Sequence, residues 1–404
     1  MRRRRRFKKA IWIVLSIVLI GIGYLIAGNK WFHTKYESLN ETDRAMFAQL
    51  NELHANTANS KEALWEDYNL HKLPIVLVAK GEILNNSKGT WNGLRKGAYA
   101  VGISGLDNKW YTKKIAMPDH FELQHVYRLS ALTPGMGSTW NPIGNFSSID
   151  QNLSIGDTSR AYYFKYNKKN LENPIKTSQY FIPFLVHENF HHVMQQHWAI
   201  ESGDLSLEGK NTEWFEYLGY QYTALDGVKD ALAGKDREAI KHAIAEYVVI
   251  SELRKQKDNN AYSMEKLHET SEGSATYVGM KASSLVSTPP LPFLAGAQSE
   301  DQRKFSYLFT VMARNPGFLS EIKWSRYDSG ALLCFALDRL YGNSSWQSKL
   351  NAQKTDLPVT LYELVKQYYD EHGLIDYAAS AASIMNNYDV KRIRDEAKRL
   401  DDQT

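Results

Sequence analysis

The chain has 404 residues, of which 43% are hydrophobic and 12% aromatic, so it can bury a large core and is not intrinsically disordered. Seven of its 49 basic residues lie within positions 1–9, and the other 42 stand against 45 acidic residues, so the body carries a net charge of −3. That balance, with no basic patch interleaved with aromatic residues, argues against nucleic acid as a partner.

An uncharged run of nineteen residues, 10–28, follows the basic N-terminus and has about the length that spans a bilayer core. A cleavable signal usually has small residues at −3 and −1, whereas cleavage after Ala27 would place Leu25 at −3. The pattern favours an uncleaved transmembrane anchor at 10–28 behind a basic cytoplasmic tail at 1–9. We therefore expect a single-pass membrane protein whose body is extracytoplasmic.

The only cysteine is Cys334, so the chain forms no intrachain disulfide and no cysteine-based zinc site. An exported body without disulfides fits a bacterial cell envelope more easily than a eukaryotic secretory route.

Two segments with different residue patterns follow the apolar run. Residues 29–72 have helical spacing of apolar residues and are expected to form a stalk or linker, or a helix packed on the body. Residues 73–176 contain short β-branched and aromatic runs broken by Gly, Asn and Asp, which predicts a small, mainly β subdomain. Its last run, 161–166, is either an edge strand that pairs with an extended peptide or an ordinary internal strand.

The rest of the chain is expected to be helical. Apolar residues recur with a period of 3.6 through 177–288 and again through 289–404. Pro289, Pro290 and Pro292 interrupt the pattern and indicate a boundary between these two subdomains.

The strongest chemical signal is His-Glu-x-x-His at His187, Glu188 and His191, inside an apolar helical stretch. Histidines four residues apart lie on one face of a helix, where both can bind one metal ion, and the glutamate can act as the general base. The alternative is a core helix that happens to carry two hydrogen-bonded histidines.

A catalytic zinc site needs a third protein ligand. We favour Glu272, which begins the string Glu-Gly-Ser-Ala-Thr-Tyr and whose small neighbours would allow close approach of the metal helix. Glu208, Glu213 and Glu216 are nearer in sequence and remain competitors, but they lack the glycine and alanine context.

These two motifs resemble those of the gluzincin zinc metallopeptidases, the thermolysin-like and aminopeptidase N-like group, over roughly residues 178–340. The resemblance implies that His187, His191 and Glu272 bind one Zn²⁺ per chain and that Glu188 is the base. In aminopeptidase-like members the glutamate follows the histidines much more closely than here. A Gly-Ala-Met-Glu-Asn-like loop is also absent, so recognition of a terminal amine is unsupported.

A second resemblance concerns Tyr327, which begins a Tyr-x-x-Gly string like the one whose tyrosine stabilises the oxyanion in aminopeptidase N-like gluzincins. Asp328 or Ser329 is expected to cap a following helix, leaving Tyr327 ahead of its first turn. The alternative is that Tyr327 only packs there. His268 either orients a ligand, contacts the reaction oxyanion or is an ordinary histidine, and His192 and His197 are expected to pack or to support the ligands.

Taken together, the sequence predicts an α+β, zincin-like metallopeptidase: a small N-terminal mainly β subdomain and a mainly helical C-terminal region, behind one N-terminal transmembrane helix. It is expected to be a membrane-anchored, extracytoplasmic zinc hydrolase acting on peptide or protein substrates. The alternatives are a catalytically inactive zincin-like binding or scaffold module and a zinc hydrolase that does not act on peptides.

Overall fold

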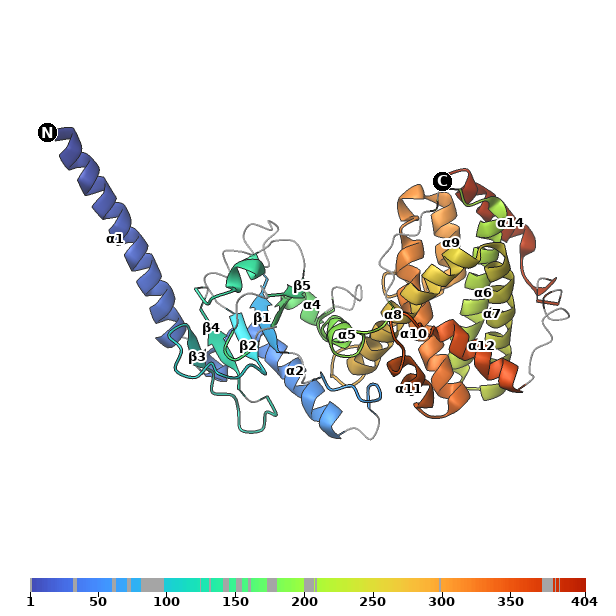
Figure 1. The fold of residues 1–404 in the computed structure, drawn as a ribbon, viewed down its shortest axis with the longest axis horizontal. Coiled ribbons are helices and arrows are strands. Elements are labelled where there is room, and N and C mark those ends of the chain that lie inside the picture. Colours follow the sequence, from blue (N-terminus) through green and yellow to red (C-terminus); the bar gives the residue numbers. More distant parts are fainter. Residues whose placement is uncertain are drawn as a thin grey trace.

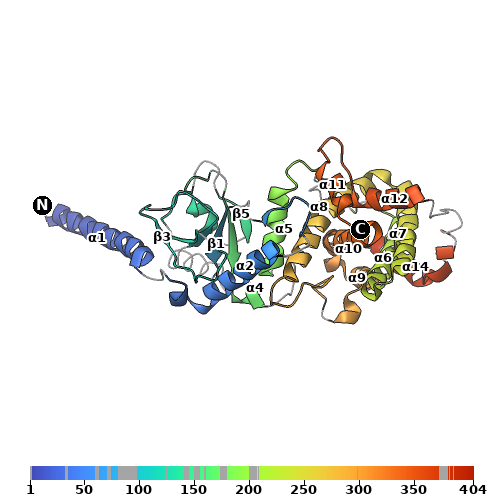
Figure 2. The same cartoon turned by 90° about the horizontal axis from the view of Figure 1, so that it is seen from below.

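The computed structural model contains a sheet region and a larger helical region that adjoin each other (Figures 1 and 2). It describes residues 2–31, 35–59, 63–70, 74–80, 98–123, 125–130, 132–140, 145–149, 155–158, 161–172, 180–199, 207, 209–297, 299–372, 381, 383–384 and 386–404.

Among these residues, six strands form one mixed sheet in the order β3-β4-β2-β1-β6-β5. The central strand β1 pairs in parallel with β6, and the other neighbouring strands are antiparallel. The strands are β1 (Ile75–Ala79), β2 (Ala98–Val101), β3 (Thr112–Lys114), β4 (Tyr127–Leu129), β5 (Phe146–Ser148) and β6 (Tyr162–Tyr166). Strand β6 is therefore internal, and β5 is the edge strand on that side.

Strand β1 is apolar throughout because both of its faces are covered. Ile75 and Leu77 belong to the main hydrophobic core, whereas Val76 and Val78 belong to a smaller cluster on the other face of the sheet. Helix α2 (Glu41–Asn59) contributes Met46 and other apolar side chains to the main core, so residues 41–59 pack on the body.

The described residues of the C-terminal region are mainly helical (Figure 1). Side-chain caps begin several of them: the side-chain oxygens of Asn211, Asp236 and Asp258 accept backbone N–H groups at the starts of α6, α7 and α8. The principal helices are α5 (Phe181–Val193), α6 (Thr212–Gly234), α7 (Arg237–Lys257), α8 (Asn259–Ser283), α9 (Phe305–Arg314), α10 (Glu321–Tyr341), α11 (Ser345–Asn351), α12 (Leu361–His372) and α14 (Val390–Asp401).

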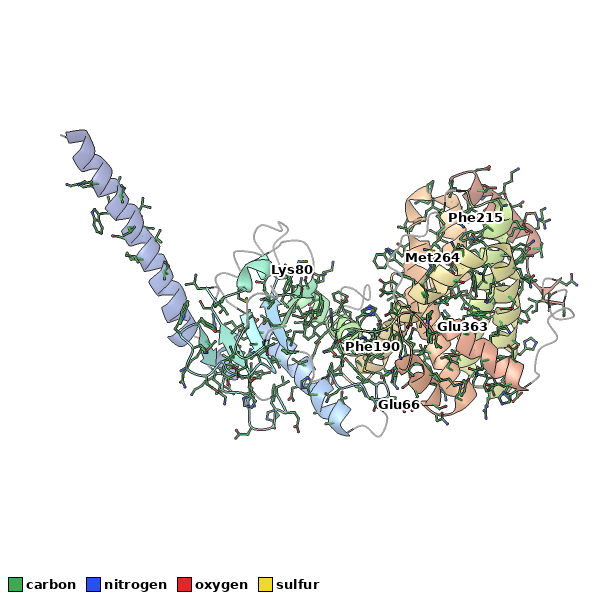
Figure 3. The ribbon with its side chains drawn as sticks, in the orientation of Figure 1. Glu66, Lys80, Phe190, Phe215, Met264 and Glu363 are labelled. Atoms are coloured by element: carbon green, nitrogen blue, oxygen red, sulfur yellow. The ribbon has the colours of Figure 1, made fainter. Side chains whose placement is uncertain are left out.

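The main hydrophobic core continues from the sheet into the helices. Helix α5 lies at the junction, where Phe190 is labelled in Figure 3. Trp65 packs at this junction, where its ring makes edge contacts with Phe190, Tyr277 and Trp346. The two regions are therefore held together by shared aromatic packing.

The prediction of a single-pass membrane protein is wrong. Of the helices in the described part of the chain, none combines the length and apolar character needed to cross a bilayer. Helix α1 (Arg2–Trp31), which extends away from the body in Figure 1, begins with a strongly basic stretch. This corrects the expected anchor and the expected extracytoplasmic location in a cell envelope.

Candidate metal centre

Helix α5 carries the His-Glu-x-x-His motif into the junction between the sheet and the helical region. Its apolar residues, among them Leu185, Val186 and Phe190, are buried and fix the rotation of the helix. That rotation turns His187 and His191 toward α8. The side chain of His187 is only 4% exposed and that of His191 is 18% exposed.

Three potential ligand atoms converge at this point. The Nε2 atoms of His187 and His191 lie 3.0 Å apart, and Glu272 Oε2 of α8 lies 3.1 Å from the first and 3.3 Å from the second. Ligands arranged tetrahedrally at about 2.0–2.1 Å from zinc lie roughly 3.3 Å from one another. The two nitrogens and the carboxylate oxygen therefore have the types and spacings that one Zn²⁺ requires. Among the described residues, His187, His191 and Glu272 thus form a group whose ligand atoms lie close enough together to hold one metal ion.

Helix α8 packs closely against α5 and α10 at two glycine residues. A Cβ at Gly279 would lie 2.7 Å from the carbonyl oxygen of Pro183 in α5, and one at Gly273 would lie 2.3 Å from Gly330 Cα in α10. The glycine beside the metal helix is thus Gly279, whereas Gly273, expected to serve that approach, faces α10. Both contacts require the absence of a side chain.

Gln195 orients His191 and was missed by the sequence analysis. Its Oε1 lies 2.6 Å from His191 Nδ1, and its Nε2 donates to Ser271 O and Ser274 Oγ of α8. His187 Nδ1 similarly lies 3.3 Å from Thr276 Oγ1. With both Nδ1 atoms engaged, both Nε2 atoms are free to face the ligand position. The available signal was the position of Gln195, four residues after His191 and just beyond the end of α5.

The charges of the cluster depend on one another. Burial alone would raise the pKa of the Glu272 carboxyl, but its hydrogen bonds with His187 and His191 outweigh burial and hold that pKa far below its usual range. Burial would lower the pKa of His191, but hydrogen bonding to Glu272 and the nearby Glu188 raise it. The site therefore stabilises an ionised glutamate.

Tyr327 of α10 lies against one side of the cluster formed by His187, His191 and Glu272. Its ring is stacked parallel to that of His187, at 5.6 Å between centroids and 6° between planes. Burial, followed by the charge of Glu272 and a hydrogen bond to it, raises the pKa of the phenol, with Glu188 contributing. Tyr327 thus remains a neutral hydrogen-bond donor, and half-buried Glu188 is close enough to act on both Tyr327 and His191.

The expected start of this helix was wrong. Helix α10 begins at Glu321, so Tyr327 lies inside it. Asp328 does not cap it, because its Oδ1 accepts the backbone N–H of Leu294. Ser329 instead donates its hydroxyl to Glu269 Oε1.

The competing glutamates lie elsewhere. Glu213 pairs with Lys257 at 2.7 Å, and Glu216 pairs with Arg394 at 2.7 Å. Glu208 is outside the described residues.

The other histidines have separate environments. His192 packs against the rings of Phe146 and Tyr162, and burial, followed by the charge of His191, lowers its pKa to about 4. His197 is exposed.

His268 is buried, and its ring makes an edge contact with Tyr327 at 5.8 Å between centroids.

Comparisons of the chain with protein-family models, with curated proteins and with solved structures found no match.

Proposed function

We propose that this protein is a zinc metallopeptidase, a hydrolase with a zincin-like α+β catalytic domain of the gluzincin type. The observation that carries the proposal is the convergence of His187 Nε2, His191 Nε2 and Glu272 Oε2 at 3.0 to 3.3 Å from one another. A general base, Glu188, and a neutral phenol, Tyr327, flank the same point.

In this mechanism His187, His191 and Glu272 would hold one Zn²⁺. That ion would supply polarisation of the scissile carbonyl and make the attacking water more acidic. Glu188 accepts a proton from the attacking water and delivers it to the departing amine nitrogen. Tyr327 donates its hydroxyl hydrogen to the carbonyl oxygen as negative charge develops there.

The arrangement of helices serves this chemistry. Gln195 and Thr276 hold the two imidazole rings in the orientation in which Nε2 faces the ion. The ring stacking between His187 and Tyr327 holds the phenol on the same side. The substrate class is peptides or proteins, as the resemblance to gluzincins implies.

The test is a broad peptide-library digestion, read by mass spectrometry, with added Zn²⁺ and with a chelator. The proposal predicts zinc-dependent cleavage by the wild-type protein and none by Glu188→Gln. Peptide binding without cleavage would identify an inactive binding module instead. Zinc-dependent turnover only of substrates other than peptides would identify a different hydrolase.

A further inference from the structure

A cluster of buried charged residues lies beside the candidate metal centre. Its members come from three helices, and each side chain is at most 6% exposed. They are Arg254 of α7, Glu265, Lys266 and Glu269 of α8, and Arg326 of α10. The cluster contains three cations and only two anions.

Both anions are already bound by the other two cations. Arg254 makes a bidentate pair with Glu265, with Nη1–Oε1 at 2.6 Å and Nη2–Oε2 at 2.7 Å. Lys266 Nζ lies 2.7 Å from Glu269 Oε2, and Ser329 Oγ donates to the other oxygen of Glu269. The excess positive charge therefore resides on Arg326.

Arg326 has no close anionic partner among the described residues. Its nearest carboxylate oxygen, Glu265 Oε2, lies 4.0 Å from Nη2, and its buried Nε has no hydrogen-bond partner in the described chain. A guanidinium does not lose its proton in a protein, and a buried charge whose nearest counter-ion, Glu265, is already paired with Arg254 carries a desolvation cost that is only partly offset. An anion at this position would remove that cost.

A second unpartnered nitrogen lies nearby. His268 is buried on α8, and its Nδ1 has no hydrogen-bond partner within the described residues. The His268 ring touches the edge of Tyr327, which is stacked on His187. His268 therefore lies beside Tyr327, and Arg326 is close enough that its charge, after burial and Glu272, acts on the pKa of His268.

The spacing along α8 relates this position to the metal centre. Glu265, next to Arg326, precedes Glu272 by seven residues, which is roughly 10 Å along a helix. An extended peptide covers about 3.3–3.6 Å per residue. A group bound at Arg326 therefore lies about three residues along a peptide from the bond held at the metal centre.

We propose that Arg326 and His268 form a carboxylate-binding subsite that anchors the substrate a short distance from the scissile bond. This inference rests on the proposed peptidase function. The planar guanidinium fork matches a carboxylate, which reaches the subsite either as the C-terminus of the peptide or as an acidic side chain.

The test is calorimetric binding to the full-length Glu188→Gln protein, which binds peptides without turnover. The probes are N-acetyl-Ala-Ala-Ala with a free carboxylate, its C-terminal amide, and N-acetyl-Ala-Glu-Ala amide. We expect at least one carboxylate peptide to bind about tenfold or more tightly than the neutral amide, since a charge-assisted pair with a buried arginine contributes about that factor. The free acid binding best identifies a C-terminal anchor, and the glutamyl peptide binding best identifies a side-chain anchor.

Adding Arg326→Gln to this protein should abolish the discrimination, whereas Arg394→Gln, at an exposed arginine paired with Glu216, should leave it intact. Equal binding of all three peptides before Arg326 is changed overturns the inference, and that comparison needs no folded Arg326 variant. Discrimination retained in the Arg326 variant overturns it as well. Because binding alone is read, the subsite can be established even if the library digestion shows no cleavage.

Discussion

His187 Nε2 and Glu272 Oε2 lie 3.1 Å apart although their residues are 85 positions apart in the chain. Helices α6 and α7 occupy most of the intervening sequence and pack against each other. The direct packing of α8 on α5, with Gly279 against Pro183, then brings the two residues together. A long insertion between the ligands is thus compatible with a compact three-ligand cluster.

The ligand assignment predicts that Glu272→Ala lowers the zinc content as strongly as His191→Ala, because each change removes one of three ligand atoms. Zinc per chain in the purified protein is measured by mass spectrometry. Glu213→Ala and Glu216→Ala are the matched controls and should retain wild-type zinc, since both glutamates form ion pairs elsewhere. An unchanged zinc content in Glu272→Ala would show that the third ligand is another residue.

Tyr327→Phe should lower kcat by about a hundredfold, because it removes one hydrogen-bond donor to the developing oxyanion. Zinc content and the melting temperature should stay close to wild type, since the stacked ring remains. Tyr307→Phe, at an exposed tyrosine of α9, is the control. A loss below about threefold would move the donor role to His268, because the hydroxyl of Tyr277 already donates to Asp338.

Gly273→Ala should destabilise the fold by about 1–3 kcal/mol, because the new Cβ would meet the backbone of Gly330, which cannot yield without separating α8 from α10. The same separation should reduce turnover by moving Tyr327 away from Glu272. Chemical unfolding and kcat are the measurements. Gly234→Ala has open space around its new methyl group and should change neither quantity appreciably. Equal behaviour of the two variants would refute the close approach of the helices.

Glu265 should make stability depend on pH in the acid range. Burial alone would raise its pKa, but Arg254, Arg326 and Lys266 outweigh burial and lower the pKa from 4.5 to about 2. This stabilisation is complete above pH 4.5, is lost as the pH falls toward 2, and amounts to about 3 kcal/mol.

Urea unfolding between pH 2.5 and 6 measures this effect. Glu265→Gln should be less stable at pH 6, because Arg254 loses its partner, and its stability should vary less with pH. Glu213→Gln, at a half-exposed ion pair, should keep the wild-type dependence. An unchanged acid dependence in Glu265→Gln would contradict the assignment.

Local patterns in the sequence were sufficient to locate several parts of the candidate site. The spacing of His187 and His191 already predicts one helical face, and the small residues after Glu272 indicate close helix packing. Gln195 could not be identified in this way, because its role depends on Ser271 and Ser274 of another helix.

Features that depend on long-range packing were predicted less well. Whether β6 is an edge strand or an internal strand depends on the order of the strands in the sheet. The alternation of side chains along one strand does not reveal that order. Aspartate is a residue type that often caps helices, but the carboxylate of Asp328 instead accepts the backbone N–H of Leu294. The uncharged run after the basic N-terminus indicated a membrane span that the described helices do not provide.

The most direct test of the central claim is the return of peptide cleavage as Zn²⁺ is added to protein stripped by a chelator. We predict that activity rises linearly and saturates at about one ion per chain, and that Glu188→Gln takes up the same single ion without gaining activity. Full activity in the stripped protein, or in Glu188→Gln, would contradict the account.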